Sequence, residues 1–128
     1  MAELFADDFN RADGALGANW TSLGGGHITI VSNRAQAAAT DDLVYWNGGT
    51  PNADCYVEAT VVSTAVATDY NNLFARLNTT SFNWYGISWD SDTGGRIRRW
   101  DAATPTTLGA NFASPTPGTV VRLEIEGS

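Results

Sequence analysis

The residues with the clearest chemical potential are aromatic and polar side chains that alternate along the middle of the chain. In runs such as 71–78 and 83–90, a period of two places every second residue on one face of a strand. Aromatic planes stack on the apolar faces of pyranose rings, while Arg, Asn and Glu bond the hydroxyls. If these strands are consecutive neighbours, one outer face carries all the candidate ligand-binding residues, which are Tyr56, Glu58, Asn72, Phe74, Arg76, Trp84, Arg98 and Trp100.

The same outer face also has a purely structural interpretation. Cross-strand aromatic pairs and Arg–Glu pairs stabilise any exposed sheet by roughly a few tenths of a kcal/mol each. The pattern is therefore more typical of a face that is covered by loops or by another subunit.

Carboxylates in the sequence do not form the pattern that hydrolysis of a glycan requires. That reaction needs an acid and a second carboxylate on either side of the scissile bond. Glu58 is the only acidic residue inside a central strand of the candidate face, and Glu58 with Asp90 is the only pair we could propose. We therefore predict that the protein is not an enzyme.

Metal and nucleophile signals are weak. Asp90-Ser-Asp92-Thr-Gly94 spaces oxygen atoms as in half of a calcium loop, but the closing Glu is missing, so a hairpin turn is the alternative interpretation. Asp90 and Asp92 stay weak calcium candidates, and no cofactor is expected. His27 lacks a partner for catalysis or metal binding, and Cys55 is predicted to be a small buried apolar residue.

Short β-rich runs separated by Gly, Pro, Asn and Asp predict an all-β fold. Their spacing near ten residues is typical of an antiparallel two-sheet β-sandwich or jelly roll, which we expect to form a single domain over residues 1–128. We predict strands at about 3–9, 27–32, 34–39, 43–46, 55–63, 71–78, 83–90, 96–101, 105–108 and 118–126.

Apolar faces of the longer strands are expected to meet between the two sheets. The last predicted strand also alternates, with Val121, Leu123 and Ile125 against charged neighbours. It stops at the turn signal Gly127-Ser128, so the domain is either truncated at its C-terminus or pairs this strand with something else. The predicted core residues are Val57, Ala59, Val61, Leu73, Ala75, Leu77, Tyr85, Ile87 and Trp89.

Composition excludes several classes of protein. The chain has 128 residues, 43% of them apolar, and a net charge of −7 in which every cationic residue is Arg. This content of apolar residues argues against disorder, and the acidic balance argues against a nucleic-acid partner. No apolar run approaches the roughly 20 residues of a membrane helix, and no signal peptide is visible, so we expect synthesis in a cytoplasm without membrane insertion.

The most specific motif is the opening run Asp8-Phe-Asn-Arg-Ala-Asp-Gly-Ala-Leu-Gly-Ala-Asn-Trp20. It resembles the start of concanavalin A-like lectin/glucanase modules, LamG-like jelly rolls found in bacteriophage minor tail and other virion proteins. Asn72–Arg76, Trp84–Gly86 and Arg96–Arg98 resemble the middle strands of these modules. The E-x-D-x-x-E pattern of the related glucanases is absent from this sequence.

The opening run also has a physical interpretation that is independent of the family. We expect Phe9 to end the first strand, Asp13-Gly14 to form a turn, and Leu16 and Trp20 to anchor the loop that follows. Arg11 and Asp13 are close enough in sequence to pair across that turn. A motif that locks the first strand is thus the alternative to a binding role.

The resemblance implies a non-enzymatic structural or adhesion module of a phage virion. Its partners would be other virion proteins or copies of itself, together with host-surface polysaccharide. The alternative is a carbohydrate-binding module of a bacterial polysaccharide-active enzyme. An unfamiliar hydrolase that uses Glu58 and Asp90 is the remaining hypothesis.

Overall fold

A computed structural model describes residues 5–23, 28–38, 43–49, 53–63 and 70–127. These residues contain β-strands and no α-helix, and every strand pair is antiparallel. The predicted all-β class is confirmed, whereas jelly-roll connectivity stays a prediction. Within the described ranges there is accordingly no helix of the length and apolarity that crossing a membrane demands.

The chain divides into two compact units, Met1–Pro51 and Asn52–Ser128, which we call the N-terminal unit and the C-terminal unit. The prediction of one domain over the whole chain stays a prediction.

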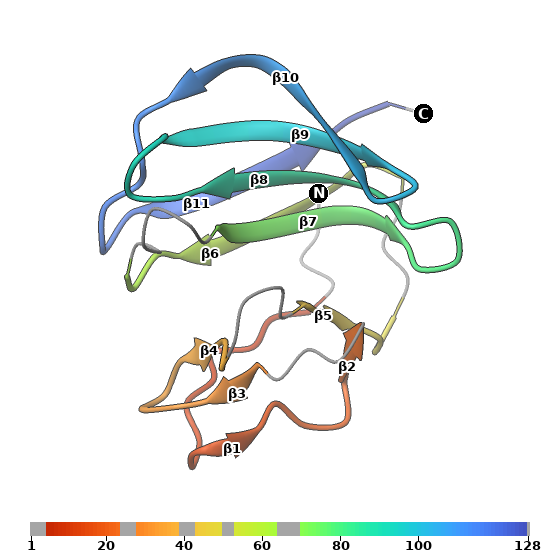
Figure 1. Ribbon diagram of the computed structural model, residues 1–128. Coiled ribbons are helices and arrows are strands. Elements are labelled where there is room, and N and C mark those ends of the chain that lie inside the picture. The colour runs from red at the N-terminus through yellow and green to blue at the C-terminus, as the bar shows by residue number, and fades with distance from the viewer. Residues whose placement is uncertain (1–4, 24–27, 39–42, 50–52, 64–69, 128) are drawn as a thin grey trace. The chain divides into compact units, whose positions relative to one another are not determined.

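The N-terminal unit holds two small sheets (Figure 1). One has the order β1-β3-β4 and the other pairs β2 with β5. Among its described residues, Leu16 and Ile30 are the buried apolar side chains. Its strands are β1 (Gly14–Ala15), β2 (Trp20–Leu23), β3 (Thr29–Ile30), β4 (Ala35–Gln36) and β5 (Leu43–Trp46).

The predicted first strand, 3–9, is wrong for the residues that the structure describes. Residues 5–9 are not in a strand, because the Asp7 side chain accepts a hydrogen bond from the Phe9 N–H and Phe9 has a φ of 54°. This positive φ turns the chain where a strand would continue. Residues 3 and 4 lie outside the described ranges.

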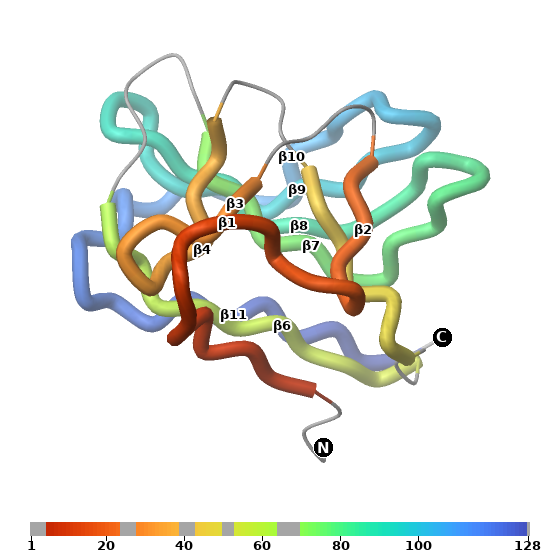
Figure 2. Tube along the Cα trace, turned by 90° about the horizontal axis from the view of Figure 1, so that it is seen from below, coloured from red at the N-terminus to blue at the C-terminus, as the bar shows by residue number. Residues whose placement is uncertain are grey.

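The C-terminal unit is a β-sandwich of two antiparallel layers (Figures 1 and 2). One layer is a four-stranded sheet of order β10-β9-β8-β7, and the other pairs β11 with β6. Its strands are β6 (Cys55–Thr60), β7 (Asn71–Asn78), β8 (Asn83–Trp89), β9 (Gly95–Asp101), β10 (Thr104–Phe112) and β11 (Val120–Ile125).

The core of this sandwich lies between β7–β8 and β6–β11. The predicted inward faces are confirmed for Val61, Ala75, Ile87 and Trp89, which are buried, with Val57 and Leu73 packed against them. The last strand also alternates as predicted. The other buried members of the core are Cys55, Val121 and Leu123.

Candidate binding site

The opening run folds into a clamp around the carboxylate of Asp7. The Phe9 N–H donates to Asp7 Oδ1 at 2.9 Å, and the Arg11 N–H donates to the Phe9 carbonyl at 2.8 Å. This tight turn carries the Arg11 side chain back over Asp7. The two then form a bidentate ion pair, with Nη1–Oδ1 at 2.6 Å and Nη2–Oδ2 at 2.9 Å.

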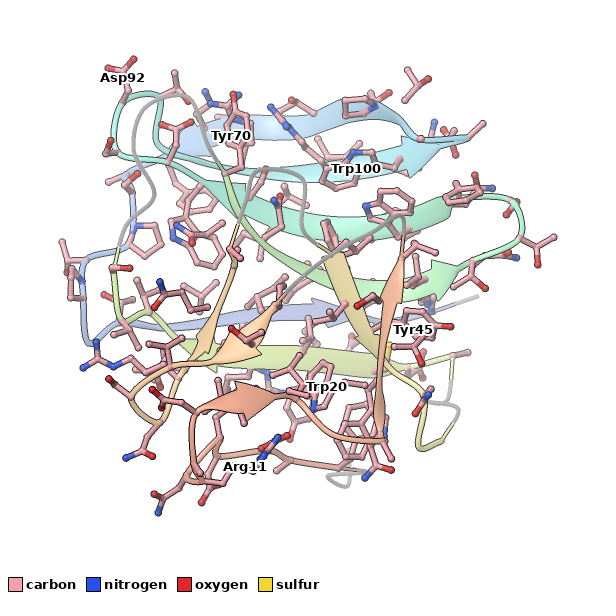
Figure 3. All side chains as sticks on the ribbon, turned by 60° about the horizontal axis from the view of Figure 1, so that its bottom comes forward. Arg11, Trp20, Tyr45, Tyr70, Asp92 and Trp100 are labelled. Atoms are coloured by element: carbon pink, nitrogen blue, oxygen red, sulfur yellow. The ribbon has the colours of Figure 1, made fainter. Side chains whose placement is uncertain are left out.

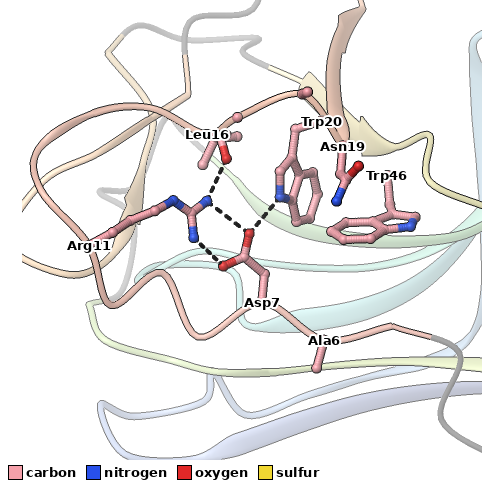
Figure 4. A pocket seen from close by; sticks show the side chains of 9 residues that line it. Ala6, Asp7, Arg11, Leu16, Asn19, Trp20 and Trp46 are labelled. Atoms are coloured by element: carbon pink, nitrogen blue, oxygen red, sulfur yellow. Dashed lines mark hydrogen bonds and ion pairs between the residues drawn. The ribbon is translucent and has the colours of Figure 1, made fainter.

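Two further hydrogen bonds tie the clamp to the rest of the N-terminal unit (Figure 4). Trp20 Nε1 donates to Asp7 Oδ2 at 2.8 Å, and Arg11 Nη2 donates to the Leu16 carbonyl. The hydrogen bond from Arg11, with smaller contributions from Trp20 and the Phe9 N–H, outweighs the effect of burial and holds the pKa of Asp7 far below its ordinary value.

The expected pairing of Arg11 with Asp13 is wrong. Arg11 is held by Asp7, and Asp13 Oδ1 instead accepts a hydrogen bond from the Ser32 N–H at 2.8 Å. Proximity in sequence favours Asp13 as the partner of Arg11, but the turn at Phe9 places the Asp7 carboxylate against the guanidinium instead. Gly14 has a φ of 144°, which favours glycine, but it begins strand β1 and pairs with Ile30 instead of forming the predicted turn with Asp13.

A row of aromatic rings surrounds this clamp. Phe9 lies 5.9 Å from Trp20, and Trp20 meets Trp46 edge-on at 5.5 Å between centroids. Phe5 stacks on Trp46 at 4.6 Å with an interplanar angle of 9°. The pairing of Trp20 with Trp46 across β2 and β5 sets the two indoles side by side.

Of these rings, Trp20 and Trp46 line a pocket of about 370 Å³ (Figure 4). Its walls combine two indoles with the Asp7–Arg11 pair and the exposed amide of Asn19. The pocket is largely open to solvent, and its wall combines aromatic planes with a few polar groups, a combination that ligand sites use. The lining residues are Ala6, Asp7, Arg11, Leu16, Gly17, Ala18, Asn19, Trp20 and Trp46.

This pocket does not follow from the sequence pattern, which indicates Trp20 as the anchor of a loop and gives Trp46 no role. The signal that could have found the pocket is the pair of short runs that carry a tryptophan, 20–23 and 43–46, which pair as antiparallel strands.

The predicted ligand-binding residues do not form one face. Tyr56 and Glu58 lie on β6, which pairs with β11 and not with β7. Since the core lies between the two layers, their outer faces point in opposite directions. Tyr56 and Glu58 instead contact Arg122, whose guanidinium carbon lies 3.9 Å from the Tyr56 ring centroid and whose Nη1 lies 4.0 Å from Glu58 Oε2.

Arg76 also leaves the predicted face. The register of β7 against β8 shifts between Ala75 and Asn78, and Arg76 has a φ of 52° at this irregularity. A bulge of this kind redirects a side chain. Arg76 Nε donates to the Ala53 carbonyl at 2.8 Å, and its Nη2 donates to the carbonyls of Ala53 and Gly127.

Phe74, Trp84 and Trp100 do come together as predicted. Trp84 lies opposite Trp100 across β8 and β9, and their rings stack at 5.5 Å, while Phe74 meets both edge-on. Gly86 makes room for them, because a Cβ there would lie 2.6 Å from Phe74 Cδ1 and 2.9 Å from Trp100 Cζ3. Trp84 and Trp100 are only 8% and 9% exposed, so packing is the role that this geometry supports for them.

Arg98 and Asn72 are both placed near Tyr70. The Arg98 guanidinium carbon lies 5.0 Å from the Tyr70 ring centroid, and that of Arg96 lies 5.3 Å from it. Asn72 Nδ2 donates to the Tyr70 carbonyl at 3.2 Å. Figure 3 shows Tyr70 at the four-stranded sheet that also carries Trp100. Glycan binding by this face stays a prediction.

The loop between β8 and β9 has the structure of a hydrogen-bonded turn. Asp90 is fully buried, and its carboxylate accepts hydrogen bonds from the Asp92 N–H at 2.8 Å and from the N–H and Oγ1 of Thr93, both at 2.5 Å. Burial would raise the pKa of Asp90, but these bonds and Arg96, 3.7 Å away, lower it overall. Among the residues that the structure describes, no group of three or more His, Cys, Asp and Glu side chains could hold a metal ion.

Cys55 is buried in the sandwich core, as predicted. His27 lies outside the described residues. No protein family, curated protein or solved structure matches the chain in comparisons with known proteins.

Proposed function

We propose that the chain is a non-enzymatic module of a bacteriophage particle that contributes to its structure and adheres to neutral glycans on the host surface. The observation that carries the proposal is the pocket in which Trp20 and Trp46 stand beside the Asp7–Arg11 pair and Asn19. Asp7, Arg11 and Trp20 belong to or adjoin the opening run, whose resemblance to virion modules supports the particle location.

The chemistry of this pocket suits a sugar. Indole rings provide apolar planes for the C–H face of a pyranose. Arg11 has five N–H donors, of which three are used by Asp7 and Leu16, so two remain for hydroxyls. The Asn19 amide adds a donor and an acceptor.

Charge favours a neutral glycan over an acidic one. The guanidinium of Arg11 is neutralised by Asp7, and the chain as a whole carries −7. A polyanionic saccharide would be repelled by this field.

The test is titration of the intact chain with neutral oligosaccharides by calorimetry, after a glycan array has selected them. Asn19→Ala and Trp46→Phe remove polar contacts and part of the indole platform, so we expect each to weaken binding about tenfold, the loss of roughly 1.4 kcal/mol. Trp100→Phe in the buried aromatic cluster is the matched control and should leave affinity unchanged. Equal affinity in all four proteins, or binding that only Trp100→Phe weakens, contradicts the pocket assignment.

Two further measurements separate the alternatives. Antibodies against the chain should label purified phage particles, whereas a carbohydrate-binding module of a bacterial enzyme would bind glycan but be absent from particles. Glycan cleavage that Glu58→Gln abolishes would overturn the non-enzymatic assignment.

A further inference from the structure

One edge of β11 has no neighbouring strand among the residues that the structure describes, whereas its other edge pairs with β6. Just before β11, the Val61 N–H donates to the Thr119 carbonyl at 2.9 Å. The bonding groups of an antiparallel strand alternate between its two edges. The N–H and C=O groups of Val120, Arg122 and Glu124 therefore point to the free edge.

This free edge lacks the features that protect other edges of the sandwich. Proline and bulges are common devices that keep a further strand from pairing with an edge. β10 contains Pro105 and a register shift, and β7 has a register shift at Arg76. β11 has no proline, and its register with β6 runs without a shift from Val120 to Ile125. The edge of β11 is therefore open to a further strand.

An uncovered apolar strip lies on the core-facing side of the opposite layer. Ile97 pairs with the core residue Ile87 on one side and with Leu108 on the other, so these side chains share that face. The Phe112 ring lies on the same face, over Gly95, where a Cβ would collide with it. Ile97, Leu108 and Phe112 are 39%, 38% and 37% exposed, and the core cluster of the described residues has no member from β9 or β10.

A strand added to the free edge of β11 would cover this strip. In Figure 1, β6 lies behind β7 and β11 behind β8, so the next strand after β11 would fall behind β9. Side chains alternate between the two faces of a strand, so every second residue of the added strand would point toward Ile97 and Leu108. The open edge and the uncovered strip thus require the same occupant, which is an extended strand.

The charges along β11 decide which strand fits. Val121 and Leu123 are buried in the core, so Arg122 and Glu124 lie on the outer face. Directly opposed residues of antiparallel neighbours lie on the same face of a sheet and interact. A complementary strand therefore places an acidic residue opposite Arg122 and a basic residue opposite Glu124, with apolar residues between and beside them. Along the antiparallel partner this pattern is apolar, basic, apolar, acidic, apolar.

From these observations we propose that the C-terminal unit binds an extended segment of another protein, which adds to β11 as an antiparallel strand and covers Ile97, Leu108 and Phe112. The segment has the alternating pattern given above and is not packed elsewhere, because its apolar face has to be available. The β11 strand of a second copy does not qualify, since Val121 and Leu123 are buried in its own core. The proposed glycan pocket is a separate site, because residues of the N-terminal unit line it.

Fluorescence anisotropy with labelled synthetic peptides tests the proposal on the intact chain. The probe peptide is Thr-Val-Lys-Val-Glu-Val-Thr, and the control peptide exchanges its Lys and Glu. Both peptides have the same composition and net charge, but the control sets like charges against Arg122 and Glu124. We therefore expect the control to bind about tenfold more weakly than the probe.

A third peptide tests the main-chain pairing. It is the probe with N-methyl groups on its Lys and Glu, whose N–H groups would bond the free edge of β11. Since methylation removes these donors and leaves the side chains unchanged, we expect this peptide not to bind.

Exchange of the two charges on β11 is the reciprocal test. Arg122 Nη2 lies 3.2 Å from Glu124 Oε2, and the double variant Arg122→Glu/Glu124→Arg keeps one residue of each charge on the strand. The order of the charges along the edge is reversed, so this variant should bind the control peptide more tightly than the probe.

Leu108→Asn tests the apolar strip. Leu108 is one of the side chains that the added strand would cover, so we expect the probe to bind this variant about tenfold more weakly. Thr107→Asn is the matched control, because Thr107 pairs with Arg98 on the other face of the sheet and should leave the affinity unchanged. Circular dichroism checks that both variants keep the fold.

Several results would overturn the inference. One is a probe peptide that does not bind the parent chain at about millimolar concentration. Others are equal binding of the probe, control and methylated peptides, or a double variant that keeps the preference of the parent chain. Equal effects of Leu108→Asn and Thr107→Asn would likewise show that the peptide does not cover the strip.

Discussion

At the scale of single residues, the clearest feature is a carboxylate that holds its surroundings together. Asp7 accepts hydrogen bonds from the Phe9 N–H, Arg11 and Trp20, and thereby connects the turn, the pocket wall and β2. The sequence could not show this, because the residues span positions 7 to 20 and their meeting depends on the positive φ of Phe9.

The low pKa of Asp7 makes the stability of the N-terminal unit depend on pH. When folding lowers the pKa of a carboxyl group, the ionised group stabilises the fold at any pH above its pKa in the unfolded chain. This stabilisation is lost as the pH falls toward its pKa in the folded protein. We expect Asp7→Asn to lower the unfolding free energy by about 2 kcal/mol at pH 7, the size of a hydrogen bond to a charged group. Near pH 3 the same substitution should lower it clearly less.

Denaturant unfolding at the two pH values, followed by tryptophan fluorescence, checks this expectation. Asp8→Asn is the control, because Asp8 accepts one hydrogen bond, from the Asn10 N–H, and no guanidinium. A cost of Asp7→Asn that does not change between pH 7 and pH 3 would show that the carboxylate charge is not what the clamp uses.

At the scale of elements, period-two patterning succeeded where strands are long and one side is buried. The predicted bounds 43–46 and 71–78 coincide with β5 and β7, and the alternation of β11 is confirmed. The patterning failed for β6, because the outer face that a strand joins depends on which strand it pairs with. A pattern of alternating residues does not say which strands are neighbours. The predicted strand 105–108 ends short of β10, which continues to Phe112 past a register irregularity that contains Gly109 with a φ of 76°.

The hairpin between β9 and β10 contains an unusual local choice. Its two-residue loop is Ala102-Ala103, with φ values of 47° and 63°, where Asn-Gly is the preferred sequence. The left-handed conformation destabilises the folded state by roughly 1–2 kcal/mol at an alanine. Glycine avoids this strain but lowers the unfolding free energy by only roughly 0.5–1 kcal/mol, because its unfolded chain has more conformational entropy. Ala103→Gly should therefore raise the unfolding free energy by about 0.5 kcal/mol.

Ala110→Gly is the matched control for that substitution. Ala110 lies in β10 and is not among the residues with positive φ, so the same chemical change should lower the unfolding free energy by about 0.5–1 kcal/mol. Equal effects of the two substitutions in urea titrations would mean that the loop geometry carries no strain.

At the scale of the whole molecule, the short β-rich runs predicted the fold class and the period-two patterning predicted much of the core, but neither predicted the candidate binding pocket. The face expected from Tyr56 to Trp100 required one sheet, whereas the structure distributes these residues over two opposite layers. The pocket of the N-terminal unit arises from short strands with little periodicity, so only the three-dimensional arrangement of Trp20 and Trp46 revealed it.

The single thiol of the chain gives the sandwich its own reporter of opening. Cys55 sits 7% exposed among Val121, Leu123 and Trp89, so a chromogenic disulfide reagent can reach it only when β6 separates from its neighbours. The reaction rate should fall by orders of magnitude between denatured and native protein, and in native buffer it should follow the global opening equilibrium. If the thiol instead reacts as fast as free cysteine, β6 is detaching on its own; a slow rate gives the free energy of opening without any denaturant.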